Sequence, residues 1–179
     1  MQPEAVPLSV ELLPRAEQLC QKTNQFNLRT VRHTATDLTE ILDDQTCRSF
    51  LVSLTDRFGN HGMVGLVVAV LRSDVAFLDS FILSCRVLGR HLEAWVLHEL
   101  TRRLRFENCG SLVAEFQPTE RNAVAQSFLP DHGLVSFEWG SSSPARRVDG
   151  IRDLVGGGGQ LYYADLQNVE IPHLEVFES

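Results

Sequence analysis

The sequence predicts an α/β (α+β) domain, in which a mixed, mostly antiparallel central sheet is flanked by helices. Residues 48–58, 63–72 and 75–85 have the composition of strands and follow one another through short turns, which predicts an antiparallel meander. A long helical segment, residues 90–106, comes next, and further strands follow it. This order differs from the strict alternation of strands and helices that predicts a doubly wound parallel sheet.

Length and composition fit one domain of ordinary size. The chain has 179 residues, of which 44% are hydrophobic and 22% charged, and a chain of this length can fold without a metal or a disulfide. Residues 1–13 contain prolines and show no clear period, so they predict an N-terminal arm before a single domain over residues 14–179. The apolar run over residues 63–71 is too short to span a membrane, and no secretory signal is recognisable, which predicts a cytoplasmic protein.

The net charge and the spacing of the cysteines argue against two further classes, proteins that bind nucleic acid and proteins held together by a metal site or disulfides. With 16 basic and 23 acidic residues the net charge is −7, which disfavours nucleic acid as a partner. The cysteines are scattered without a Cys-x-x-Cys pair, which predicts reduced thiols and neither a metal site nor a disulfide framework. They are Cys20, Cys47, Cys85 and Cys109.

The elements before the meander are predicted from local signals. Pro14 stands at the first turn of a helix-forming segment, so residues 15–22 predict a short helix. Residues 28–33 alternate as a strand does. Thr36 predicts the N-cap of a second helix, which ends near Asp43.

Within the meander, residues 59–62 predict the first hairpin turn, because they are rich in residue types that tolerate positive φ. Residues 63–72 are apolar on both faces and therefore predict a central strand. In the strand over residues 75–85 the odd positions share one face. These positions are Phe77, Asp79, Phe81, Leu83 and Cys85.

The later elements follow the same signals of apolar pattern and breaker residues. We expect strands over residues 111–116, 134–139 and 161–165, a short helix over residues 122–128, and a loop over residues 141–147.

The segment that most clearly predicts a ligand-binding site runs from the third meander strand into the long helix. It contains Arg86, Gly89 and Arg90, and the helix starts directly after them. Free backbone N–H groups at a helix N-terminus bind phosphate oxygens, and arginines beside them add charge. The spacing alone also fits an ordinary tight turn, because one glycine before a helix is common.

This segment resembles motif A of the GNAT acyltransferase superfamily, an Arg/Gln-x-x-Gly-x-Gly/Ala loop that binds the pyrophosphate of acyl-coenzyme A or the corresponding stretch of phosphopantetheine. His91 stands where the family usually has Gly or Ala. The resemblance implies a GNAT-type fold and a cofactor-binding loop. The residues implied are Arg86, Val87, Leu88, Gly89 and Arg90.

A second match follows in the order that the GNAT superfamily has. Asn122-x-x-Ala125-x-x-Phe128, followed by Gly133, resembles motif B, in which the asparagine and its helix lie beside the pantetheine arm. This resemblance adds Asn122 to the implied cofactor-binding residues.

A narrower resemblance covers about residues 15 to 140. Residues 21–28, 56–59 and 79–90, together with Pro118, Thr119 and Asn122, resemble the C-terminal domain of FkbH-like proteins. It implies delivery of a small hydroxyacyl, glyceryl-type group to the phosphopantetheine thiol of an acyl carrier protein in polyketide-type biosynthesis. A haloacid-dehalogenase-type phosphatase is the second partner that it implies, since the Asp-x-Asp motif of such a domain does not occur in this chain.

Each candidate site residue also has an ordinary structural role. Cys85 can act as a nucleophile that holds the acyl group as a thioester, or it can be a packing residue at a strand end. His91 can act as a general base or lie on the surface. Hydroxyacyl groups need polar partners, which the chain also uses for turns and buried hydrogen bonds. The candidate substrate contacts are Asn24, Gln25, Asn27 and Asp79.

Three functions remain open from the sequence. The first is acyl transfer to a carrier protein, with Cys85 as the intermediate carrier of the acyl group. The second is an N-acetyltransferase that uses acetyl-coenzyme A and needs no covalent intermediate. The third is a non-catalytic module that binds a carrier protein.

Overall fold

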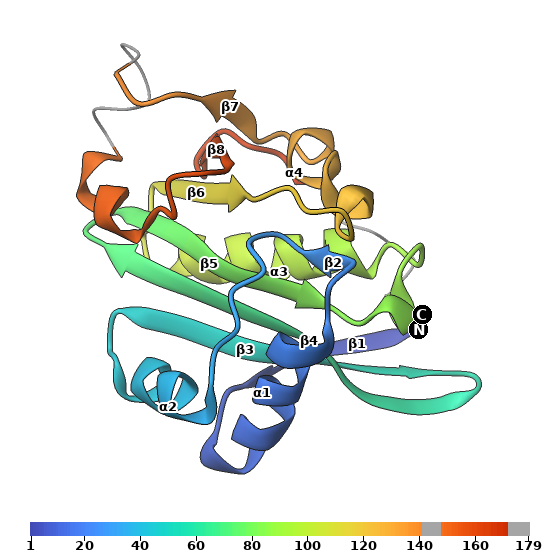
Figure 1. Ribbon diagram of the computed structural model, residues 1–179. Helices are drawn as coiled ribbons and strands as arrows, with labels where there is room; N and C mark the ends of the chain where they lie inside the picture. The colour runs from blue at the N-terminus through green and yellow to red at the C-terminus, as the bar shows by residue number, and fades with distance from the viewer. Residues whose placement is uncertain (141–147, 172–179) are drawn as a thin grey trace.

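The computed structural model describes residues 1–140 and 148–171, so the loop expected over residues 141–147 lies outside the described residues. Eight strands form one sheet in the order β1-β3-β4-β5-β6-β8-β7, with β2 paired to β5 beside this path (Figure 1). Within it β5 and β6 are parallel, and the other pairings are antiparallel. The expected mixed, mostly antiparallel sheet is therefore confirmed.

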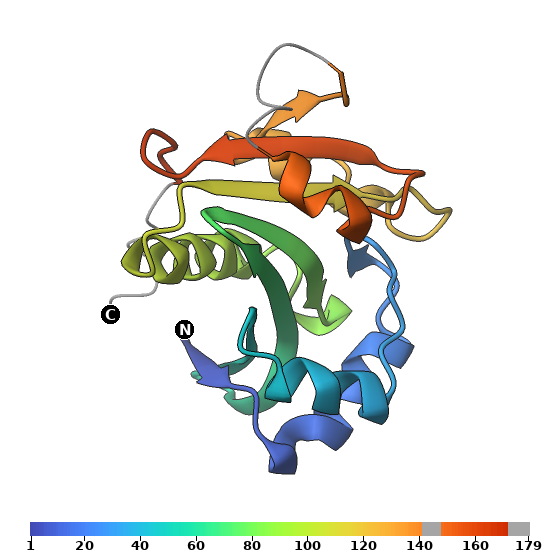
Figure 2. The ribbon, with the colours of Figure 1, turned by 90° about the vertical axis from the view of Figure 1, so that its left-hand side faces the viewer.

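Helices cover both faces of this sheet. On one face lies α3 (Leu92–Phe106), and on the other lie α1 (Leu13–Lys22) and α2 (Ala35–Asp43) (Figure 2). Each face has its own buried cluster: Leu97 and Leu100 of α3 pack in the first, whereas Leu19 of α1 packs in the second. None of the helices in the described residues is long and apolar enough to cross a membrane.

The first residues belong to the sheet, which corrects the expected N-terminal arm over residues 1–13. Gln2–Pro7 form β1, which pairs in full with β3, and a short 3-10 helix over Val10–Leu12 leads into α1. The prolines are compatible with this strand because β1 is the edge of the sheet, where one side needs no ladder partner.

The expected strand over residues 28–33 is wrong. Strand β2 is only Phe26–Asn27, and Thr30 has φ +57°, a left-handed conformation that ends an extended segment. The second helix begins earlier than expected, because Thr34 and Asp37 form a reciprocal capping box that places the N-cap at Thr34 instead of Thr36.

The three meander strands are confirmed as β3 (Cys47–Asp56), β4 (Gly59–Arg72) and β5 (Val75–Leu83). Strand β4 lies between the other two, as its two apolar faces predict. The first turn falls at residues 57–58 and not at residues 59–62, which are paired or part of β4.

A β-bulge corrects the predicted face of β5. Val68 pairs with Ser80 and Ala69 pairs with Leu78, so Asp79 is an extra residue without a partner on β4. The bulge shifts the alternation by one: Phe77 packs in a different cluster from Phe81, which the odd-position pattern placed on the same face. The strand also ends at Leu83, before Cys85.

One edge of β5 has two partners in succession. Its first half pairs in parallel with β6 (Ser111–Phe116), and this pairing stops at Leu78 and Ala114. Further along the same edge of β5, Leu83 and Ile82 pair with β2. The N–H of Leu28 donates to the carbonyl of Phe81, while the Leu28 carbonyl accepts from Gln117, directly after β6. The segment after β2 thus joins the two strands where they separate.

The last part of the sheet is β8 (Gln160–Asp165), with β7 (Val135–Phe137) paired to it. The expected helix over residues 122–128 is divided into a 3-10 turn, Ala123–Ala125, and the short helix α4, Phe128–Asp131. The remaining 3-10 helices are Cys85–Val87 and Asp149–Leu154.

We predict that Phe81→Ala lowers the free energy of unfolding by about 3–5 kcal/mol. Phe81 is fully buried, and its ring lies 6.0 Å from that of Phe26 and 5.1 Å from that of Phe128, so it connects β2 and α4 to β5. Urea denaturation measures the loss. Val135→Ala, at a side chain that is 67% exposed, is the control, and an equal loss in both variants would contradict the packing role of Phe81.

Candidate functional site

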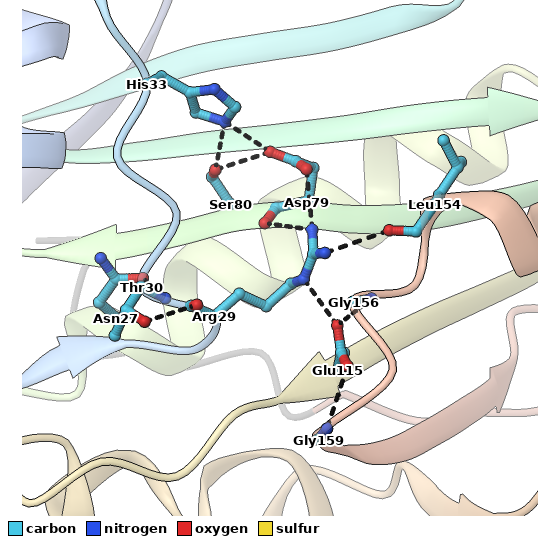
Figure 3. A network of polar contacts seen from close by, with 10 residues as sticks. All are labelled: Asn27, Arg29, Thr30, His33, Asp79, Ser80, Glu115, Leu154, Gly156 and Gly159. Atoms are coloured by element: carbon cyan, nitrogen blue, oxygen red, sulfur yellow. Dashed lines mark hydrogen bonds and ion pairs between the residues drawn. The ribbon is translucent and has the colours of Figure 1, made fainter.

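The parallel pairing of β5 and β6 stops where both strands place a carboxylate. Asp79 follows the last paired residue of β5, and Glu115 follows that of β6. The guanidinium of Arg29 lies between them: its Nη1 is 2.8 Å from Asp79 Oδ1, and its Nε is 2.9 Å from Glu115 Oε2 (Figure 3). One buried cation thus bridges two acids that would otherwise repel each other across the gap.

Asp79 has further partners on the other side. His33 Nε2 lies 2.7 Å from Asp79 Oδ2, and the hydroxyl of Ser80 donates to the same oxygen at 2.9 Å. Burial raises the pKa of this carboxyl, but the hydrogen bond and charge of His33, together with the charge of Arg29, outweigh burial and lower the pKa below its ordinary value.

Glu115 is fully buried and is held by backbone donors. The N–H groups of Gly156 and Gly159 donate to its two oxygens at 3.0 and 3.2 Å. Burial raises its pKa, and the Gly156 hydrogen bond, with those of Gln117 and Arg29, more than offsets this and lowers it. At Gly159 a Cβ would lie 2.6 Å from the carbonyl oxygen of Phe116, so this close approach requires glycine.

These contacts give Asp79 an internal structural role, while its expected contact with a substrate stays a prediction. Its carboxylate is engaged by Arg29, His33 and Ser80, and it does not line the pocket that contains Cys85. The sequence placed Asp79 and Cys85 on one face. The bulge at Asp79 and the end of β5 before Cys85 remove that relation.

A pocket of about 490 Å³ lies at the end of β5, between that strand and α1. It brings together four of the expected site residues, Asn24, Gln25, Cys85 and Arg86. Cys85 is exposed here, whereas Cys20 and Cys109 are buried and Cys47 is half-buried. Burial raises the pKa of Cys20 and of Cys47 to about 11, so these two thiols are poor nucleophiles near neutral pH.

The loop after Cys85 separates its side chains into two groups. Arg86 is exposed and lines the pocket, while Val87 is fully buried and Leu88 packs against the cluster under α3. Val87 and Leu88 therefore anchor the loop, and a ligand contact from Val87 would come through its backbone.

The end of this loop turns into α3. Gly89 has φ +74° with open space where a Cβ would be, and His91 has φ +61° at the N-cap of the helix, where its side chain is exposed. Arg90 donates to Asp56 Oδ2 at 2.9 Å, an ion pair with the β3–β4 hairpin. Because α3 begins at Leu92, the N–H groups of its first turn lack partners within the helix.

The expected polar contacts divide into two kinds. Gln25 is exposed in the pocket, and Asn24 lines it while accepting a hydrogen bond from Arg32. Asn27 instead is buried, accepts from the N–H of Thr30 at 2.8 Å and donates to the carbonyl of Thr23. This corrects the expected substrate contact at Asn27, whose amide closes the turn around β2.

Asn122 has a similar internal role, which corrects its expected contact with the cofactor. Its side chain is fully buried and donates to the carbonyls of Asn27 at 3.0 Å and Gln117 at 2.9 Å, and it accepts from the N–H of Thr119 at 2.7 Å. The bond to Asn27 connects the β2 segment to the loop after β6, and the other two hold that loop in place.

Helix α1 forms a side of the pocket that was not predicted from the sequence. Arg15, Gln18 and Lys22 of α1 line it opposite Arg86. Their spacing of three and four residues places them on one helix face, a signal that was present in the sequence. In the described residues, no group of three or more His, Cys, Asp or Glu side chains could hold a metal ion.

The sequence matches no model of a known protein family, and no curated protein matches it either. Solved structures do match. An acetyltransferase of the GNAT family from Staphylococcus aureus covers 92% of this chain and 99% of its own, with a TM-score of 0.66 and 10% identity. This likeness, which spans nearly the whole chain, assigns the chain the fold of the GNAT acetyltransferases.

Two further solved structures are similar to this chain over about 90% of its length. The ribosomal-protein-S18-alanine N-acetyltransferase from Escherichia coli has a TM-score of 0.62 and 15% identity and covers 90% of this chain and 91% of its own. The PaiA N-acetyltransferase from Thermoplasma acidophilum, in complex with coenzyme A, has a TM-score of 0.68 and 11% identity and covers 92% and 99%. At these identities the likeness concerns the fold.

We predict that Arg29→Met lowers the free energy of unfolding by about 3–5 kcal/mol, because it leaves two carboxylates facing each other without their cation. Thermal and urea denaturation measure the loss. Arg102→Met is the matched control, since Arg102 is 60% exposed and its partner Glu99 keeps a second ion pair with Arg103, so we expect a loss of about 1 kcal/mol or less. Similar losses in both variants would show that Arg29 does not stabilise the strand separation.

Proposed function

We propose that the protein is an acyltransferase of the GNAT type that takes its acyl group from the thioester of acetyl-coenzyme A. The observation that supports this proposal is that the chain has both the fold of acetyltransferases and a pocket at the end of β5. The chain shares its fold with acetyltransferases over about 90% of its length, and its pocket opens where β5 ends and the chain turns into α3.

The loop before α3 fits the phosphates of coenzyme A. The open space at Gly89 lets an anion approach the backbone without meeting a side chain. The N–H groups at the start of α3, which have no partners within the helix, favour negative charge through both hydrogen bonds and the helix dipole. The groups that would hold the phosphates of the cofactor are therefore Gly89 and the N–H groups of the first helical turn, while Arg86 lines the pocket at the end of β5.

The β2 segment occupies part of the edge of β5. Because β2 pairs with Leu83 and Ile82, and Leu28 bonds to Phe81, the backbone near the end of β5 is already paired on this edge. An acyl arm held at Gly89 would then reach the pocket beside Ser84 and Cys85, which line it. The pocket is where the thioester meets the second substrate.

In this pocket we propose that the acetyl group is transferred by direct attack of an amine, without an enzyme-bound intermediate. The nitrogen of an amine attacks the thioester carbonyl, a C–N bond forms, and the C–S bond breaks as coenzyme A leaves as a thiol with the proton that the amine gives up. His91, the expected general base, stands at the N-cap of α3 and does not line the pocket, so in this proposal the proton leaves through solvent.

We predict that Gly89→Val lowers the affinity for acetyl-coenzyme A by about tenfold or more, because a branched side chain both strains a residue at φ +74° and fills the space of the phosphate. Isothermal titration calorimetry measures the affinity. Gly157→Val is the matched control: Gly157 has φ +78° and equally open surroundings in another loop. Equal affinities in both variants would remove the loop from the donor site.

A second candidate is the transfer of a hydroxyacyl group to the phosphopantetheine thiol of an acyl carrier protein. The observation that favours it is the exposure of Cys85 inside the pocket, beside Gln25 and Asn24. Their amide groups offer donors and acceptors to a glyceryl-type group. This candidate rests on the FkbH-like resemblance, and it takes a carrier protein and a haloacid-dehalogenase-type phosphatase as partners.

In this second candidate Cys85 carries the acyl group between donor and acceptor. Its thiolate attacks the carbonyl carbon of the donor, a C–S bond to the enzyme forms, and the bond to the donor's leaving group breaks. The thiolate of the phosphopantetheine then attacks the enzyme thioester and releases Cys85.

Replacing Cys85 with alanine separates the two candidates. For transfer from acetyl-coenzyme A to an amine, we predict an unchanged rate in Cys85→Ala and no acyl adduct on the wild type by intact mass. Loss of activity together with an adduct on the wild type, absent in the variant, would support the carrier route instead. Binding of a carrier protein without transfer from any thioester donor would contradict both and leave a binding module.

A further inference from the structure

The pocket at the end of β5 is cationic, although the chain as a whole has a net charge of −7. Arg15, Lys22 and Arg86 line it from two elements, α1 and the loop after β5. No aspartate or glutamate is found among the described residues that line it. Three positive charges thus converge on a cavity that supplies no counter-charge of its own.

Arg15 is fixed in position before any ligand binds. Its Nε and Nη2 donate to the carbonyl of Met63 at 2.9 and 2.5 Å, and its Nη1 donates to Gln18. These bonds use three of the five N–H groups of a guanidinium and leave two for a ligand. Burial, and then the charge of Arg86, lower the pKa of Arg15, which agrees with two cations that lie close together without an anion.

We propose that this pocket binds the phosphate group of the acyl acceptor, so that the second substrate is a small phosphorylated molecule. The inference rests on the proposed function, because it assigns the pocket to the acceptor of the acyl group. Two arginines and a lysine match the charge and the oxygens of a phosphate, and the amides of Asn24 and Gln25 suit the polar remainder of the molecule. The same charges disfavour a polyamine, whose acceptor nitrogens are carried on a cation.

The position of the pocket separates it from the phosphates of the donor. The pocket faces α1, whereas α3, whose N-terminus is assigned to the donor, packs on the opposite face of the sheet (Figure 2). Val87, buried in the cluster under α3, lies between the two places along the chain. Cys85 and the end of β5 stand between them, where an acyl group from one side can reach an acceptor on the other.

The test uses inorganic phosphate as the probe and isothermal titration calorimetry on the full chain. We expect wild type to bind phosphate and Lys22→Met to bind it about tenfold more weakly, the change that loss of one charge-assisted hydrogen bond gives. Lys22→Met combined with Arg86→Met should abolish measurable binding. Both side chains are exposed, so the variants should fold, which circular dichroism and the melting temperature without phosphate check.

Arg72→Met is the charge-matched control. Arg72 ends β4 and pairs with Val75 at the start of β5, the far end of that strand from the pocket. Phosphate affinity equal to that of the wild type is expected in this variant. The proposal is overturned if wild type does not bind phosphate, or if Arg72→Met weakens binding as much as Lys22→Met does.

A competition experiment distinguishes the two sources of phosphate. Acetyl-coenzyme A is titrated into the protein with and without saturating inorganic phosphate, and equal affinities support a separate acceptor site. Displacement of phosphate by acetyl-coenzyme A would assign the pocket to the donor and overturn the acceptor proposal while the proposed function stands. Binding of phosphate but not of acetyl-coenzyme A would show that the proposed function itself has failed, and the acceptor assignment with it.

Discussion

The arrangement of the site depends on the buried guanidinium of Arg29, which bridges Asp79 and Glu115 where β5 and β6 separate. Two buried carboxylates at the same level of neighbouring strands repel each other unless a cation lies between them. The cation, together with the N–H groups of Gly156 and Gly159, satisfies these charges without joining the strands. The separation is thereby made a stable part of the sheet.

The gap that follows is filled by the chain itself. Strand β2 pairs with the end of β5, and the carbonyl of Leu28 accepts from the N–H of Gln117 after β6. The side chain of Asn122 donates to the carbonyl of Asn27 in the same segment. This closure leaves the end of β5 accessible from the side of α1. The pocket therefore combines Cys85 and Arg86 of one element with Arg15 and Lys22 of another. In this way the internal polar contacts decide where a ligand can lie.

The main strands and helices were predictable because their patterns are local: the apolar faces of β4, the stripe of α3 and the proline at the start of α1 each need only neighbouring residues. The errors have two origins. The bulge at Asp79, which shifts the faces of β5, depends on the pairing with β4, and the buried bond from Asn122 reaches Asn27 in a distant segment, so neither can be read from neighbouring residues. The left-handed Thr30, which bonds to Asn27, and the capping box at Thr34 are local features that the apolar pattern does not reveal.

The sequence by itself determined the mixed sheet, the central strand, the long helix after an Arg-x-x-Gly turn, and the choice of Cys85 and Arg86 as neighbours in one site. Adjacent residues in a strand-to-helix turn stay together in any fold, so this part needed no tertiary information. Only the tertiary structure decided that α1 adds Arg15 and Lys22, and that Asp79 faces Arg29 instead of the pocket. Charges that are distant in sequence meet only after the sheet has formed, and a local pattern does not encode which of them will be neighbours.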